Sequence, residues 1–174
     1  VDFVEFHQAH GNLSYQFFSP IDNRRVDRYG KGISGRMRFG LECVSAMRKA
    51  VGEDYPIFVR LGAVDEAPGG VLPTDAADYA VELEKATVDC FDVSVGNCST
   101  TDYATYVSPL KKSPMGTYAH LAEAIRKSVD IPVVAVGRIN TPDVAEGILG
   151  KGQADLVAIG RQLICDPCWV IKAV

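Results

Sequence analysis

The hydrophobic residues of the chain gather into five short runs that are rich in β-branched and aromatic side chains. Runs of this length, bounded by turn-forming residues, are typical of strands that are buried on both faces of a parallel sheet. The five runs cover residues 3–7, 57–61, 91–96, 131–137 and 154–160. We therefore expect five parallel strands, and no sixth.

The segments between these runs repeat their apolar residues with the period of an α-helix. Residues 34–51 carry one apolar stripe, and Gly52 is the expected stop. Thr74 is the expected N-cap of a second helix, and residues 118–129 predict a third. A fourth begins at Thr141-Pro142-Asp143, where a hydroxyl cap precedes a proline at the first helical position. The chain therefore alternates strands and helices.

Alternating strands and helices predict an α/β fold in which the helices pack outside a parallel sheet. An open, doubly wound sheet can hold five strands, whereas a (β/α)8 TIM barrel needs eight and five cannot close a ring. Both architectures keep their chemistry at the carboxyl ends of the strands. The pattern alone leaves the two architectures about equally supported.

Composition and charge narrow the class of partner. The chain has 174 residues, of which 47% are hydrophobic and 23% charged, and its formal net charge is -4. This mild acidity disfavours binding to nucleic acid, and no apolar run reaches the roughly 20 residues that span a bilayer. We expect a globular protein with a small-molecule substrate, and the sequence gives no indication of its oligomeric state.

The five cysteines do not indicate a disulfide framework. They are Cys43, Cys90, Cys98, Cys165 and Cys168. An odd number of cysteines beside a large apolar core fits a reducing compartment, so we expect the protein in the cytoplasm. Cys165 and Cys168 form a single C-x-x-C pair, which without a second pair predicts buried or half-buried thiols rather than a metal site.

Two histidines follow the first expected strand. His7 and His10 are three residues apart, so both imidazoles face one pocket if the chain turns helically there. Neutral imidazoles can donate hydrogen bonds to a carbonyl oxygen and stabilise negative charge that develops on it. An equally well supported interpretation is that both histidines are partly buried and form their hydrogen bonds with the backbone. No third ligand has convincing spacing, so we expect no metal.

Gly-Arg pairs end the last two expected strands. Gly137-Arg138 and Gly160-Arg161 place a glycine where the backbone can approach a ligand closely. In barrels, the loops after the last two strands commonly form a phosphate site. Ordinary turn glycines with surface arginines are the alternative. The chain contains neither G-x-G-x-x-G nor a P-loop, so it has no dinucleotide fingerprint of those kinds.

Arg60 lies inside an apolar strand, where a charge is costly unless it meets an anion or a polar ligand. The alternation of the strand turns Val59 and Leu61 one way and Arg60 the other, towards the ligand side if the sheet belongs to a barrel. An internal ion pair is the alternative.

Several segments of the chain, taken in order, carry a family resemblance. They are residues 4–13, 16–20, 23–25, 27–30, 36–39, 131–139 and 154–161. In these motifs the chain resembles the old yellow enzyme family of FMN-dependent NADH:flavin oxidoreductases, over nearly its whole length. The resemblance implies a (β/α)8 barrel with FMN at its mouth, and it implies that residues 1–174 are the carboxyl-terminal portion of that barrel, strands four to eight, with no second domain.

The resemblance also implies roles for single residues. His7 and His10 match the pair that binds the carbonyl of the substrate, and Arg60 matches the arginine beside the flavin pyrimidine. Gly137, Arg138, Gly160 and Arg161 match the phosphate-binding segments. The implied reaction passes hydride from NAD(P)H through FMN to the β-carbon of an activated alkene, namely an enone, an enoate or an enoyl thioester.

Asn12 departs from the family pattern, because the family commonly has a proton-donating tyrosine there. An amide cannot deliver a proton as a phenol does, and nearby Tyr15 need not face the pocket. Asn12 keeps open other flavin reactions on the same barrel, namely amine dehydrogenation and reduction of an aromatic acyl-CoA. A non-catalytic fragment that binds a phosphate ligand is a third possibility. Larger relatives carry a 4Fe-4S cluster and FAD beyond the barrel, and the region of Gly30 and Asp166-Pro167 favours that branch.

Overall fold

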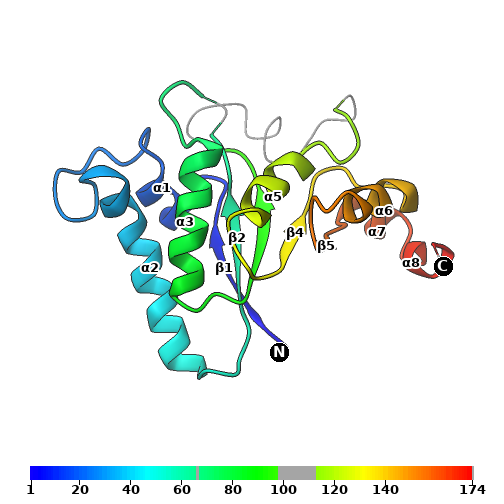
Figure 1. Ribbon diagram of the computed structural model, residues 1–174, viewed down its shortest axis with the longest axis horizontal. Coiled ribbons are helices and arrows are strands. Elements are labelled where there is room, and N and C mark those ends of the chain that lie inside the picture. Colours follow the sequence, from blue (N-terminus) through cyan, green and yellow to red (C-terminus); the bar gives the residue numbers. More distant parts are fainter. Residues whose placement is uncertain (66, 98–112, 174) are drawn as a thin grey trace.

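Five parallel strands form one sheet in the computed structural model, which describes residues 1–65, 67–97 and 113–173 (Figure 1). The strands are β1 (Val4–Gln8), β2 (Ile57–Gly62), β3 (Cys90–Ser94), β4 (Val133–Ala135) and β5 (Leu156–Val157). Every neighbouring pair is parallel, and the strands lie in the order β1-β2-β3-β4-β5. The five strands predicted from the apolar runs are confirmed. Cys98 lies outside the described residues.

Helices follow the strands along the chain. They are α1 (Leu13–Phe18), α2 (Gly32–Val51), α3 (Pro73–Lys85), α5 (Ala119–Arg126), α6 (Pro142–Gly150), α7 (Arg161–Cys165) and α8 (Trp169–Lys172). The predicted stop at Gly52 is confirmed, since this residue caps α2 with φ +89°. The structure also contains the short helices α1, α7 and α8, which the apolar pattern did not predict.

The expected N-cap at Thr74 is wrong. Helix α3 begins at Pro73, so Thr74 is already helical and Leu72 is the capping residue. Asp75 accepts a hydrogen bond from the backbone N–H of Leu72 at 3.1 Å, which holds the chain at the helix start. Proline at the first helical position costs no backbone hydrogen bond, and it outweighs the hydroxyl signal of Thr74. At α6 the predicted start is confirmed, with Thr141 as the N-cap and Pro142 first in the helix.

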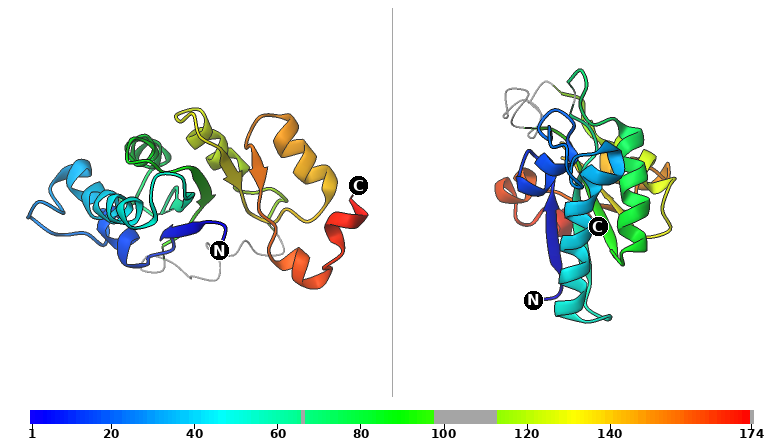
Figure 2. Two further views of the ribbon diagram at one scale, coloured as in Figure 1. Left: turned by 90° about the horizontal axis from the view of Figure 1, so that it is seen from below. Right: turned by 90° about the vertical axis from the view of Figure 1, so that its left-hand side faces the viewer.

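The order of the strands decides the architecture. A doubly wound sheet reverses its strand order at a switch point and carries helices on both faces. Here the order never reverses, and α2, α3, α5 and α6 lie along one side of the sheet (Figure 2). The sheet is therefore an arc of a (β/α)8 barrel, and its five strands cover only part of the ring.

The helix-facing side of the sheet forms the core. Val59, Leu61, Phe91 and Val93 alternate along β2 and β3 and are fully buried together with the apolar faces of the helices. Each such side chain stabilises the fold by about 1.5–3 kcal/mol through the removal of apolar surface from water.

The inner side of the arc has a different character. Glu5 and His7 of β1 are exposed, and Leu156 of β5 keeps 49% of its surface. Phe3 is 44% exposed and stacks on Phe58 with ring centroids 4.4 Å apart. Polar groups on this side therefore have room to meet a ligand at the carboxyl ends of the strands.

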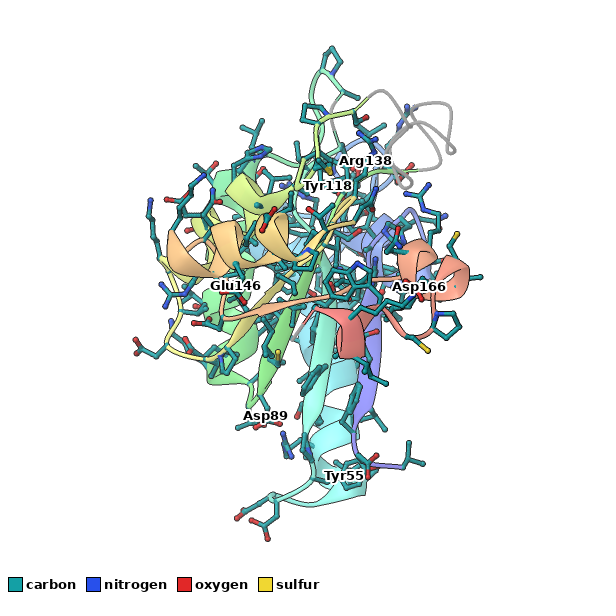
Figure 3. The ribbon with its side chains drawn as sticks, turned by 90° about the vertical axis from the view of Figure 1, so that its right-hand side faces the viewer. Tyr55, Asp89, Tyr118, Arg138, Glu146 and Asp166 are labelled. Carbon is teal, nitrogen blue, oxygen red and sulfur yellow. The ribbon has the colours of Figure 1, made fainter. Side chains whose placement is uncertain are left out.

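Arg48 of α2 binds residues at the amino-terminal ends of β2 and β3. Its guanidinium donates to the carbonyl of Tyr55 at 2.6 Å and to the carboxylate of Asp89 at 2.5 Å, and this carboxylate also accepts from the N–H of Ile57. Figure 3 shows Tyr55 and Asp89 at this lower end, far from Tyr118 and Arg138 at the upper end. Stabilising contacts and candidate chemistry therefore lie at opposite ends of the sheet.

In the part of the chain that the structure describes, no helix has the length and apolar character needed to cross a membrane.

Candidate active site

A tight turn after β1 brings the two predicted histidines together. The helical turn that was the condition for this arrangement does not form, because His10 and Gly11 both have left-handed backbones, with φ +63° and +71°. The Asn12 N–H closes the turn on the carbonyl of Ala9 at 3.2 Å. The rings of His7 and His10 nevertheless meet edge to face, with centroids 5.0 Å apart.

The register of the sheet sets polar side chains level with these histidines. His7 pairs with Arg60 across β1 and β2, and Arg60 pairs with Asp92 across β2 and β3. The Arg60 guanidinium forms an ion pair with Asp92 at 2.5 Å and donates to the hydroxyl of Ser94 at 3.5 Å. That hydroxyl lies 2.7 Å from Nε2 of His10. The four side chains of His10, Ser94, Arg60 and Asp92 form one connected group, which we call the polar chain.

Burial and the charge of Arg60 keep both histidines neutral. Burial, reinforced by Arg60 and His7, lowers the pKa of His10 to about 4. His7 is exposed overall, but desolvation of its ring by the neighbouring side chains, and then the charge of Arg60, also lower its pKa. At pH 7 each ring therefore has one N–H donor and one lone pair, as a carbonyl-binding pair requires.

Asp92 is a buried carboxylate with an incomplete set of partners. Burial raises its pKa to about 6, although the Arg60 charge and hydrogen bond act in the opposite direction. Its Oδ2 binds Arg60, whereas its Oδ1 is buried without a hydrogen bond among the described residues. Arg60 therefore makes the internal ion pair that the sequence left open as the alternative, and it also lines a cavity.

Neither residue considered for proton donation is a phenol that faces the histidines. Asn12 is exposed and donates its side-chain amide to the carbonyl of Ala9 at 3.3 Å. Tyr15 is fully buried, and its hydroxyl donates to Asp65 at 2.8 Å. Burial and the Asp65 charge raise the pKa of Tyr15 well above its ordinary value. Tyr15 therefore serves the interior of the fold.

The two Gly-Arg pairs meet at one cavity of about 610 Å³ at the carboxyl ends of β4 and β5. Its lining includes Gly137, Arg138, Gly160, Arg161 and Arg60 together with Tyr118, Val136, Ile139, Asn140, Ala158, Ile159, Gln162 and Cys165. Figure 3 shows Tyr118 and Arg138 side by side at this end of the sheet. Both Gly-Arg pairs therefore line the same cavity, and their role in holding a phosphate stays a prediction.

The backbone at the first Gly-Arg pair is shaped for close packing. Gly137 has φ +111°, and a Cβ added there would lie 2.7 Å from the ring of Tyr118. Arg138 has φ +56°, and its guanidinium donates to the carbonyl of Ser113. A side chain at position 137 would therefore meet both backbone strain and a clash.

The lining of the cavity fits a ligand that carries phosphate and an apolar ring. Its charged side chains in the described chain are three arginines, and no carboxylate lines it there. The remainder combines aliphatic residues with the amides of Asn140 and Gln162. A volume of several hundred Å³ is ordinary for a cofactor site. These residues fit FMN in both charge and size.

Arg60 is the link between the two groups of candidate residues. It belongs to the polar chain and also lines the cavity, whereas His7, His10 and Asn12 are not among the described residues that line it. The structure thus places the predicted residues in two neighbouring sites that share one guanidinium.

Sequence reasoning missed three residues of this region, namely Asp92, Ser94 and Tyr118. Asp92 and Ser94 alternate within an apolar run, which puts both on the inner side of the arc beside Arg60. That alternation was visible in the sequence and is the signal that could have found them. Nothing local distinguishes Tyr118, because only the fold brings it beside Gly137.

Comparison with known proteins confirms the family resemblance over the whole chain. Residues 1–174 match the sequence model of the NADH:flavin oxidoreductase / NADH oxidase family. The NADH oxidase of Thermoanaerobacter brockii is 45% identical over 172 residues, which are 99% of this chain and 26% of that protein. The metal reductase of Desulforamulus reducens is 44% identical over 95% of this chain and 24% of its own length. The NADPH dehydrogenase of Geobacillus sp. is 39% identical over 99% of this chain and 48% of its own length.

Solved structures agree with these relatives. A complex of 2-naphthoyl-CoA reductase with 2-naphthoyl-CoA superposes with a TM-score of 0.88 at 31% identity, over 95% of this chain and 25% of that one. Histamine dehydrogenase from Rhizobium sp. 4-9 superposes with a TM-score of 0.82 at 26% identity, over 98% and 24%. The chain spans about a quarter to a half of the length of these relatives and structures. It belongs to the NADH:flavin oxidoreductase / NADH oxidase family, the old yellow enzyme family.

Proposed function

We propose that the protein carrying this chain is an FMN-dependent NAD(P)H oxidoreductase that reduces an activated alkene. The observation that carries this proposal is the pair of imidazoles of His7 and His10, with ring centroids 5.0 Å apart, next to Arg60, whose guanidinium also lines the cavity. When bound, FMN would accept hydride from NAD(P)H and pass it to the β-carbon of the alkene.

The cavity residues would hold the cofactor. Arg138 and Arg161 bring positive charge to the phosphate, and Gly137 and Gly160 let the backbone approach it. Arg60 brings a cation to the side of the cavity that faces the histidines, where it would stabilise negative charge on the pyrimidine part of the ring.

The histidines would hold the substrate. Each neutral ring has one N–H donor, and two donors on one carbonyl oxygen draw electron density from the conjugated β-carbon. The low pKa of His10 keeps its proton on one nitrogen only, so the ring polarises the oxygen without protonating it outright. Asn12 leaves the final proton to come from water or from another group.

Amine dehydrogenation is the second candidate. Asn12 favours it, because removal of hydride from an amine needs no phenol to protonate a carbon. The likeness to histamine dehydrogenase supports the same choice, and the likeness to 2-naphthoyl-CoA reductase supports an aromatic acyl-CoA instead. A phosphate-binding barrel without catalysis is the remaining alternative.

One anaerobic experiment separates these candidates. We expect the purified full-length protein to be yellow with FMN bound, and NADH or NADPH to bleach the flavin absorbance. An enone such as 2-cyclohexenone should then restore the colour, while in a separate sample an amine should bleach the oxidised flavin no faster than buffer does. A protein that stays colourless with added FMN contradicts both flavin reactions and leaves the non-catalytic alternative.

The wider organisation of the protein is also a proposal. The matches to much longer relatives support a chain in which residues 1–174 form strands four to eight of the barrel, with a 4Fe-4S cluster and FAD in further domains. Iron and FAD analysis of the full-length protein tests this. The reducing cytoplasm remains the expected compartment.

A further inference from the structure

The Ser94 hydroxyl occupies a junction that the proposed reaction leaves without a role. It lies 2.7 Å from His10 Nε2 and 3.5 Å from the Arg60 guanidinium, and Ser94 is 1% exposed. A hydroxyl has one hydrogen to donate and two lone pairs. Because Ser94 is buried, His10 and Arg60 together determine which atom accepts the hydroxyl hydrogen.

The donors and acceptors around Ser94 Oγ determine the direction of the hydrogen bond between Ser94 and His10. Arg60 can only donate, so in this pair Ser94 Oγ is the acceptor. The Ser94 hydrogen then has His10 Nε2 as its partner, which needs a lone pair on Nε2. The opposite arrangement would turn two N–H donors towards one oxygen beside a cation and leave the hydroxyl hydrogen without a partner among the described residues.

The ion pair with Asp92 stabilises the same arrangement. Asp92 binds the other guanidinium nitrogen of Arg60 at 2.5 Å, so the cation is held in place beside Ser94. A fixed positive charge on this side of the ring favours a lone pair at Nε2 over a hydrogen. The consequence is that the ring proton of His10 resides on Nδ1.

Nδ1 is then a donor without a partner in the described chain. His10 is 8% exposed, and its ring makes no hydrogen bond there besides the one to Ser94. A buried donor of this kind is costly unless a ligand accepts from it. The ring of His7 lies next to it, so a ligand oxygen would find two imidazoles at the same point.

We propose that Ser94 is a positioning residue that fixes His10 as the Nδ1–H tautomer, so that His10 donates from Nδ1 to the substrate carbonyl oxygen. This inference rests on the proposed function for the identity of the acceptor, but the tautomer itself does not depend on flavin or substrate.

The tautomer can be measured directly in the full-length protein. Long-range 1H–15N spectra of protein labelled with 15N-histidine separate a protonated from an unprotonated ring nitrogen, and His10→Gln assigns the signal. We expect His10 to carry its proton on Nδ1 with and without FMN. Exposed His120 serves as the reference ring.

Variants of Ser94 test the cause. In Ser94→Ala we expect the proton to redistribute towards Nε2 and kcat/KM for 2-cyclohexenone to fall about tenfold, mostly through KM. Ser94→Thr retains the hydroxyl and should restore both the spectrum and kcat/KM. Ser128→Ala, which removes an exposed hydroxyl just beyond the carboxyl end of α5, should change neither.

Two results overturn the proposal. One is a wild-type His10 whose proton resides on Nε2, and the other is an unchanged Nδ1–H tautomer in Ser94→Ala. Failure of the proposed function would look different, because the protein would then bind no FMN or reject the enone while the His10 tautomer stayed as described.

Discussion

The carboxyl ends of β1–β3 and those of β4–β5 lie along one edge of the same sheet, but they carry different chemistry. At β1–β3 each member of the polar chain holds the next by a hydrogen bond or an ion pair. At β4–β5, glycine backbones and arginines surround an open cavity. The polar chain sets the protonation states of His10 and Asp92, whereas the cavity offers positive charge and space for a ligand. Arg60 belongs to both.

This difference predicts that substitutions in the two regions fail in different ways. Changes in the polar chain should alter turnover and its pH dependence while the cofactor stays bound. Changes in the cavity should weaken binding of the cofactor first.

The largest expected effect is on turnover. His7→Ala with His10→Ala removes both donors to the substrate oxygen, and loss of one such donor already costs about 100- to 1,000-fold in rate. We expect enone turnover to fall at least about 1,000-fold while FMN remains bound with its normal spectrum. His120→Ala, which lies on the exposed face of α5, should be indistinguishable from wild type. Turnover that survives in the double variant contradicts the assigned role.

The next largest effect is on cofactor affinity. Arg138→Gln and Arg161→Gln each remove a cation from the cavity, and hydrogen bonds to charged groups contribute about 1.5–3 kcal/mol. We expect the Kd for FMN, measured by quenching of flavin fluorescence, to rise about 10- to 100-fold in each variant. Arg24→Gln in the loop after α1 is the matched control. An unchanged Kd in both cavity variants would place the phosphate elsewhere.

The pH dependence of turnover sharpens the comparison. Asp92 is ionised above its pKa of about 6, so protonation below pH 6 breaks the ion pair that holds Arg60. We expect kcat/KM for the enone to decline below pH 6, and FMN affinity to change less. Asp92→Asn imitates the protonated state, so its kcat/KM should already be reduced at pH 7 and should stay level down to pH 5. An acid limb near pH 6 that persists in Asp92→Asn would assign that limb to another group.

The same shifts make opposite contributions to stability. The folded pKa of Asp92 is raised from 3.8 to about 6, so its contribution to the free energy of unfolding falls as pH rises across that interval. The folded pKa of His10 is lowered from 6.5 to about 4, so its contribution rises with pH between about 4 and 6.5. Denaturant unfolding of His10→Gln and Asp92→Asn from pH 4 to 7 should show slopes that change in opposite directions.

The smallest effect on turnover is expected at Tyr15. Tyr15→Phe removes the hydroxyl that Asp65 accepts, which should lower the free energy of unfolding by about 1–3 kcal/mol and change enone turnover less than about twofold. Tyr55→Phe removes an exposed hydroxyl that donates to the Val1 carbonyl, and it should cost much less stability. A large loss of turnover in Tyr15→Phe would restore this phenol as a candidate proton donor.

The sequence by itself determined the number of strands, because each strand is a short, mostly apolar run bounded by turn-forming residues. It also determined the clearest helix boundaries, such as Gly52 and Thr141-Pro142, since backbone preferences act within a few residues. Arg60 stood out because a charge inside an apolar strand is costly without an anion or a polar ligand, and the Gly-Arg pairs stood out because they end two successive strands.

Only the tertiary structure decided how these parts combine. Strand order depends on contacts between distant segments, so local periodicity could not separate the barrel arc from a doubly wound sheet. The polar chain depends on register, which sets Arg60 level with Asp92 although the two residues are far apart in the chain. Protonation states depend on burial and on neighbouring charge in three dimensions, and no sequence spacing contains that information.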